Sequence, residues 1–75
     1  HIRRQEVEIG QRVRARFLTV PQMVEKERAK EKDIYPIRLG EIVWIHPKGR
    51  LVSVKTTVRG GQITETFRPW EVMPE

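Results

Sequence analysis

Two short apolar runs flank a turn signal within residues 40–55. The first run covers residues 42–45, the second covers residues 51–54, and Pro-Lys-Gly at residues 47–49 lies between them. Valine and isoleucine favour extended backbone, proline presets its own φ angle, and glycine accepts a positive one. This pattern predicts a β-hairpin, and the other elements are placed relative to it.

The direction of the Trp44 side chain depends on the phase of the first hairpin strand. Alternate residues of a strand point to opposite faces, and β-branched side chains favour the interior. We therefore expect Val43 and Ile45 to face the core, with Ile42 and Trp44 outside. That arrangement makes an exposed apolar patch, which usually marks a contact site. In the opposite phase, Trp44 belongs to the core.

Arginine alternates with apolar residues between Gln11 and Val20. The arginines are Arg12, Arg14 and Arg16, and the apolar residues between and after them are Val13, Ala15 and Phe17. A period of two predicts a strand with one apolar face and one arginine face. The strand is expected to end near Val20, because Pro21 has no amide hydrogen to donate to a ladder.

The C-terminal third of the chain predicts a turn, a strand and a helical turn. Gly60-Gly61 predicts a tight turn, since glycine takes positive φ angles freely. Alternation from Gln62 to Phe67 predicts a strand. The segment from Arg68 to Val72 has Pro69 at its start and predicts a single helical or 3₁₀ turn. Val72 and Met73 are expected to close over the core.

Two segments are less regular. Residues 21–39 contain an almost wholly charged stretch, residues 25–33, after which Ile34, Tyr35 and Ile37 restore apolar character. The charged stretch has helix-forming residues but no apolar stripe, which is typical of a solvated helix, a mobile loop or a segment ordered only by a partner. We treat it as an elaborated loop between two core strands. Near the N-terminus, residues 7–9 predict a short strand before Gly10, and residues 1–6 are expected to fray.

The order of these elements resembles that of the small SH3-like barrel, in which the long first connection corresponds to the RT-type loop and a helical turn precedes the last strand. The resemblance implies a mainly β fold: a small SH3-like barrel of five strands, or four. Residues 40–43, Gly-Glu-Ile-Val, are also similar to the start of KOW-type barrels of ribosomal and transcription proteins. The residues that carry the resemblance are Val13, Ala15, Phe17 and the ranges 40–45, 51–54 and 67–72.

Composition limits the chain to one small domain, residues 1–75, with 37% hydrophobic residues. The chain has no cysteine, which is typical of a cytoplasmic protein, and no apolar run near the roughly 18 residues that a membrane span needs. Because the sequence starts at His1 rather than methionine, we expect it to be a trimmed or processed piece.

The net charge of +5 favours an anionic partner, with DNA or RNA first, although solubility alone explains a charge of about this size. The arginine face offers the most specific site, since residues two apart on a strand are about 6.6–7 Å apart, close to the spacing of successive phosphates. Lys55 and Arg59 extend this basic surface in the same interpretation. The expected nucleic-acid-binding residues are Arg12, Arg14, Arg16, Lys48, Arg50 and Trp44.

The alternative interpretation of the arginine face is a solvated surface whose charges pair with Glu8, Glu41 or Glu65 on neighbouring strands. A second function class is then a protein-interaction module, in which another protein or a second copy meets the charged loop and exposed aromatic residues. The candidate partner-binding residues are Tyr35, Trp44 and Trp70, although Trp70 is expected mainly as a lid on one end of the barrel.

Enzyme signatures are absent from the sequence. There is no nucleophile elbow, no glycine-rich phosphate loop and no H-E-x-x-H motif. The two histidines, His1 and His46, have no ligand spacing around them, and a cysteine-based zinc site is impossible. We therefore expect a non-enzymatic binding module without a cofactor or metal.

Overall fold

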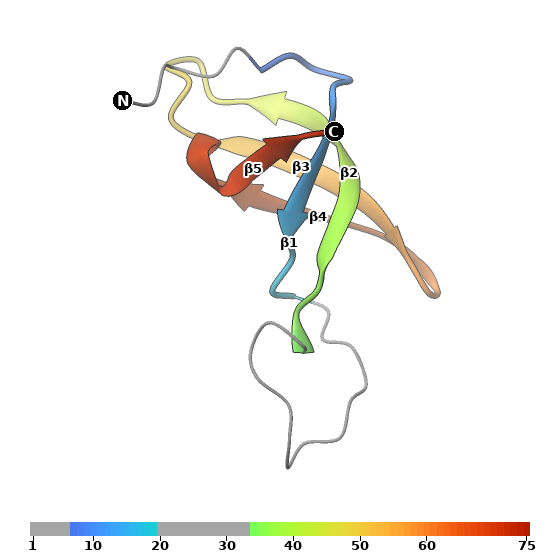
Figure 1. Ribbon diagram of the computed structural model, residues 1–75. Coiled ribbons are helices and arrows are strands. Elements are labelled where there is room, and N and C mark those ends of the chain that lie inside the picture. The colour runs from blue at the N-terminus through green and yellow to red at the C-terminus, as the bar shows by residue number, and fades with distance from the viewer. Residues whose placement is uncertain (1–6, 20–33) are drawn as a thin grey trace.

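The computed structural model describes residues 7–19 and 34–75, which form one open antiparallel sheet of five strands (Figure 1). The spatial order of the strands is β4-β3-β2-β1-β5, so β4 and β5 are the two edges. The mainly β prediction with five strands is therefore confirmed. The elements are β1 (Arg12–Arg16), β2 (Ile37–Ile45), β3 (Val52–Val58), β4 (Gly61–Phe67), the 3₁₀ helix η1 (Pro69–Glu71) and β5 (Val72–Pro74).

Strand β2 is long enough to pair with different neighbours along its two halves. Residues 37–41 pair with β1, and residues 41–45 pair with β3. Figure 1 shows β2 rising beside β1 and then curving away over the top of the molecule. This curvature brings the two parts of the sheet face to face around a single interior.

Gly40 lies where β2 changes neighbours. A Cβ atom added at this position would be 2.6 Å from Val54 Cγ1 and 2.7 Å from the Lys55 carbonyl oxygen. Both distances are shorter than a carbon atom tolerates, and the second contact is with backbone, which cannot rotate away. Only glycine therefore allows β2 to approach β3 this closely.

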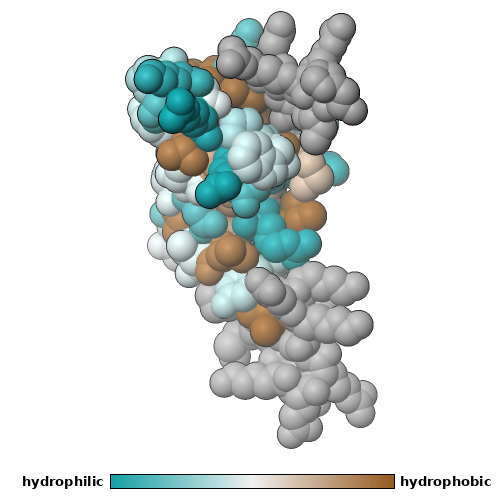
Figure 2. All heavy atoms as spheres, turned by 90° about the vertical axis from the view of Figure 1, so that its left-hand side faces the viewer, coloured by the Kyte–Doolittle hydropathy of each residue, from teal (hydrophilic) through white to brown (hydrophobic). Residues whose placement is uncertain are grey.

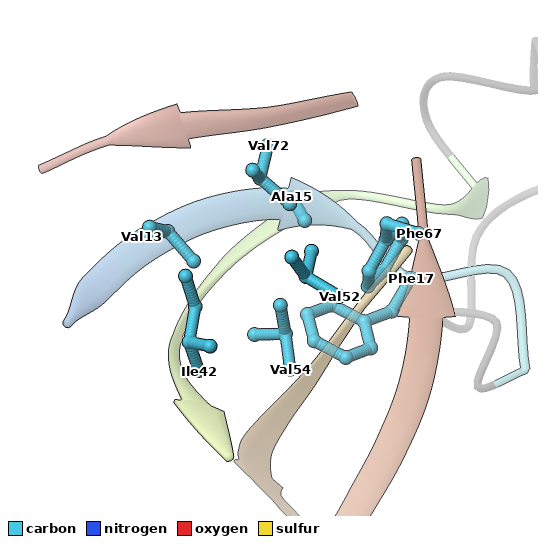
Figure 3. Packing of buried hydrophobic residues seen from close by; sticks show 8 residues of the cluster. All are labelled: Val13, Ala15, Phe17, Ile42, Val52, Val54, Phe67 and Val72. Carbon is cyan, nitrogen blue, oxygen red and sulfur yellow. The ribbon is translucent and has the colours of Figure 1, made fainter. Parts of the chain in front are cut away.

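The interior is filled by side chains from all five strands and from Phe17, directly after β1. Figure 3 shows these side chains pointing toward one another. The Phe17 and Phe67 rings make an edge-to-face contact with centroids 5.1 Å apart, a geometry that aromatic rings prefer. Each fully buried large side chain stabilises the fold by roughly 1.5–3 kcal/mol. The buried apolar residues are Val13, Ala15, Phe17, Ile42, Val52, Val54, Phe67 and Val72.

Two polar side chains, one buried and one half-buried, link separate strands of the sheet. The buried Thr56 hydroxyl donates a hydrogen bond of 2.6 Å to the Leu39 carbonyl oxygen. The Glu65 carboxylate on β4 accepts the backbone N–H groups of Leu18 and Thr19, each at 3.1 Å. Because Leu18 and Thr19 follow β1, the carboxylate joins the end of β1 to β4 through a side chain rather than through a backbone ladder.

Both tight turns and the helical turn lie where the sequence predicts them. Gly49 has a φ of 69° and its N–H donates to the His46 carbonyl oxygen at 2.7 Å, which closes the β2–β3 hairpin. Gly60 has a φ of 94° between β3 and β4. Helix η1 begins at Pro69, as predicted, and Val72 behind it closes over the core. Met73 is exposed, so its expected place in the core is wrong.

Three predicted boundaries are wrong. Strand β1 ends at Arg16, whereas the strand was expected to continue to near Val20; Phe17 keeps the inward direction of Val13 and Ala15 but lies outside the ladder. Strand β2 begins at Ile37, so the predicted loop does not extend to Leu39. Val7 to Ile9 is not a strand: a turn closes there, and the Gln11 N–H donates to the Glu8 carbonyl oxygen at 3.1 Å. The predictions for residues 1–6 and 20–33 lie outside the described residues.

Replacing Gly40 by alanine is expected to destabilise the protein by about 1–3 kcal/mol. The added methyl group collides with Val54 and the Lys55 carbonyl. This cost exceeds the stabilisation of roughly 0.4–1 kcal/mol that alanine gives by lowering the conformational entropy of the unfolded chain. Urea unfolding followed by circular dichroism measures the change. Thr57→Ala, on the exposed face of β3, is the control and should stay within about 0.5 kcal/mol of the wild type. Equal stability of Gly40→Ala and the wild type would rule out the close approach.

Candidate nucleic-acid interface

A β-bulge in β2 sets the direction of Trp44. Ile42 lies opposite Val54, but Trp44 lies opposite Ser53, so Val43 is an extra residue with no counterpart on β3. The bulge places both Ile42 and Ile45 on the inner face and leaves Trp44 on the outer face, 44% exposed. The expected outward Trp44 is thus observed. The expected exposure of Ile42 and burial of Val43 are wrong, since Ile42 is fully buried and Val43 only half-buried.

The Trp44 ring is braced by His46. The two rings meet edge to face with centroids 6.0 Å apart. The Lys48 N–H donates to His46 Nδ1 at 3.0 Å, which fixes the imidazole against the hairpin turn. A ring held in this way loses little conformational entropy when a ligand stacks on it.

Trp44 begins a row of side chains that crosses three strands on the outer face. Ser53 on β3 and Thr66 on β4 follow it in register, and their hydroxyl oxygens share a hydrogen bond of 3.0 Å. The next row contains Glu41, Lys55 and Thr64. We call Trp44, Ser53, Lys55 and Thr66 the outer-face site. Its surface combines an aromatic ring, two hydroxyl groups and an ammonium group, with Glu41 at its margin.

Arg12, Arg14 and Arg16 lie on the same outer face of the sheet, on β1, opposite the buried residues of that strand. Two of the three already have partners within the protein. Arg12 Nε forms an ion pair with Glu75 Oε1 at 3.3 Å. Arg16 Nη1 donates to the Tyr35 carbonyl oxygen at 2.7 Å.

Arg14 is exposed, and the residues beside it on the two neighbouring strands are apolar. Its register partners are Leu39 on β2 and Met73 on β5. In the row beyond, Arg12 has Glu41 opposite it on β2. Among the described residues, the ion pair on this face is therefore Arg12–Glu75, whereas the alternative interpretation named Glu8, Glu41 or Glu65. Glu41 lies in register with Arg12, and the Glu65 carboxylate instead accepts the N–H groups of Leu18 and Thr19.

The structure divides the expected nucleic-acid-binding residues into two groups. Lys48 and Arg50 are exposed in the hairpin turn that follows β2, at the Trp44 end of the outer face. The three arginines lie on β1, one strand away on the other side of Glu41. The sequence reasoning missed Ser53 on β3 and Thr66 on the edge strand β4. The alternation of polar residues 53, 55 and 57 with apolar Val52 and Val54 was the available signal.

Trp70 and Tyr35 are separate from the outer-face site. Trp70 lies on η1 and is 65% exposed, so its expected role as a lid is wrong. The Arg68 guanidinium lies over the Trp70 ring, 5.5 Å from its centroid. Figure 2 shows the side of the molecule that carries η1, where hydrophobic side chains are scattered among hydrophilic ones. Tyr35 is half-buried and contributes its carbonyl oxygen to Arg16.

Within residues 7–19 and 34–75, no cluster of three or more histidine or carboxylate side chains is arranged to hold a metal ion. The same residues include no helix with the length and apolar character required to cross a membrane. Searches among protein-family models, curated proteins and solved structures found no match for this chain.

The fluorescence of both tryptophans is expected to have the emission maximum typical of solvent-accessible indole rings. A Trp70→Phe variant reports Trp44 alone, and a Trp44→Phe variant reports Trp70 alone. Acrylamide should quench both, and Trp70 more strongly, because its ring is the more exposed. Fluorescence titration against a free tryptophan derivative measures this. A blue-shifted, unquenched Trp44 would contradict the bulge, since a core position follows only from the other strand phase.

Proposed function

We propose that this protein is a small, non-enzymatic binding module that binds single-stranded nucleic acid on the outer-face site. The observation that carries the proposal is the half-exposed Trp44 ring, braced by His46 and aligned with the Ser53–Thr66 hydroxyl pair. An exposed aromatic ring on a sheet is a stacking platform for a base, and stacking is worth about 1–3 kcal/mol per base.

The polar groups around Trp44 suit the backbone of the same ligand. Ser53 and Thr66 offer hydroxyl donors to phosphate oxygens, and Lys55 offers a positive charge one row away. Neighbouring strands are about 4.8 Å apart, and alternate residues along a strand about 6.6–7 Å. The spacing along a strand is the one close to that of successive phosphates, so Ser53 and Lys55, two residues apart on β3, suit two successive phosphates. Because Glu41 interrupts the cations, we expect weak affinity with modest salt dependence.

The finer fold assignment belongs to the same proposal. We infer that the open sheet represents an SH3-like barrel, whose outer faces are free for ligands. The strand order with β5 beside β1, the 3₁₀ turn before β5 and the Phe17–Phe67 contact support this assignment. The Glu65 carboxylate further supports it, because it links the end of β1 to β4 across the interior.

A protein partner is the alternative function. The observation in its favour is the apolar surroundings of Arg14, where Ile37 and Met73 are exposed on the outer face of β1, β2 and β5. Apolar side chains around an arginine are typical of interfaces with proteins. Binding there is expected to be insensitive to Trp44→Ala, which separates the two functions.

Trp44→Ala is expected to weaken binding of a fluorescent ten-nucleotide oligothymidylate by about 5- to 150-fold, which corresponds to the loss of one stacked base. Lys55→Ala is expected to weaken it less and to reduce the slope of log K against log salt by about 0.7, since one phosphate contact is lost. Fluorescence anisotropy at several salt concentrations measures both quantities.

Trp70→Ala is the matched control, because Trp70 is equally aromatic and more exposed but lies on η1. Its effect on affinity should be less than twofold. Absence of binding at tens of micromolar protein in low salt would refute the proposal. Equal losses for Trp44→Ala and Trp70→Ala would place the ligand elsewhere.

A further inference from the structure

The two edges of the sheet are protected unequally. Strand β5 has only three residues, ends in Pro74 and is followed by Glu75, and such features discourage another strand from adding. Strand β4 has seven residues, Gly-Gln-Ile-Thr-Glu-Thr-Phe, with no proline and no cationic residue. The one charged side chain of β4, Glu65, points to the inner face and accepts the N–H groups of Leu18 and Thr19. An edge of this length without proline or lysine is a template for pairing with another strand.

The backbone direction of β4 follows from its turn. Val58 lies opposite Gly61 across a two-residue connection, so these two form a hydrogen-bonded pair. The register continues without a bulge, and hydrogen-bonded and non-hydrogen-bonded pairs therefore alternate along β4. Gln62, Thr64 and Thr66 fall on the positions whose N–H and C=O groups point to the free edge.

This free edge is accessible within the part of the chain that the structure describes. Gln62, Thr64 and Thr66 are all exposed. Leu18 and Thr19 approach β4 through the Glu65 carboxylate, which belongs to the inner face, and these hydrogen bonds do not involve the β4 backbone. The close Ser53–Thr66 hydroxyl contact of 3.0 Å is what a non-hydrogen-bonded pair with β3 produces.

We propose that β4 pairs antiparallel with β4 of a second copy of this chain, about a twofold axis at Thr64. This register places Thr64 opposite Thr64 and Gln62 opposite Thr66, and it forms about six backbone hydrogen bonds. In this register, the backbone N–H and C=O groups of all three residues that point to the free edge find hydrogen-bond partners in both copies. Two five-stranded sheets thereby become one continuous sheet. The contact is isologous, because the same strand is used by both copies, so assembly stops at the dimer.

The side chains of β4 favour its own copy as the partner strand. On the outer face, only uncharged threonine and glutamine side chains meet across the axis. On the inner face, Glu65 lies opposite Ile63 of the other copy, so the two carboxylates do not face each other. Like charges directly opposite destabilise a strand pair, and this register contains none. The inference stands independently of nucleic-acid binding.

Sedimentation equilibrium over a range of protein concentrations tests the dimer. The wild type is expected to show reversible monomer–dimer association. Thr64→Lys and Thr64→Glu each place two like charges across the axis, so each variant alone should associate at least tenfold more weakly. An equimolar mixture of the two should recover association, because lysine then meets glutamate.

Thr57→Lys is the matched control. Thr57 is exposed on β3, opposite Gln62 and one strand away from the edge, so the same substitution there should leave association unchanged. Circular dichroism confirms that each variant is folded. The proposal is overturned if the wild type is monomeric at all concentrations, if Thr64→Lys associates like the wild type, or if the mixture fails to recover.

Discussion

The close approach of β2 to β3 at Gly40 is the constraint on which the remaining structure depends. A five-stranded sheet made from so short a chain can enclose a core only if one strand serves both halves. Strand β2 does so by pairing with β1 through residues 37–41 and with β3 through residues 41–45. A side chain at residue 40 would hold the two strands apart, and the packing of Val13 and Ile42 against Val54 would be lost.

The bulge at Val43 is the second irregularity of β2 that shapes the core. A regular strand cannot direct both Ile42 and Ile45 inward, because they are three residues apart. One extra residue allows both to reach the core and leaves Trp44 outside. The same local irregularity therefore adds apolar area to a small interior and presents an aromatic ring to solvent. Stability and the candidate binding surface share one cause.

The sequence predicted those elements whose signal is local. The hairpin turn, the alternation of Arg12 to Phe17 and the proline-led η1 depend on neighbouring residues, and the structure has all three. Burial of Ile42 was missed because a bulge changes the strand phase without changing composition. Trp70 was misplaced because none of the η1 residues is buried, and the buried residue of this segment is Val72, two positions later. Ser53 and Thr66 become neighbours only through the β3–β4 register. The pattern of residues within each strand does not reveal which residues of two strands lie opposite each other.

Net charge is a poor guide to the surface that this chain offers to a ligand. Its positive excess is real, yet the most regular cationic feature, the arginine face, is bordered by Glu41 and Glu75 and tied to the Tyr35 carbonyl. Screening at physiological salt weakens such mixed rows further. Stacking on a braced ring and hydrogen bonds from hydroxyl groups are less sensitive to salt. In the binding mode that we propose, the outer-face site would therefore depend on Trp44 and its row, and the charge of Lys55 would only supplement them.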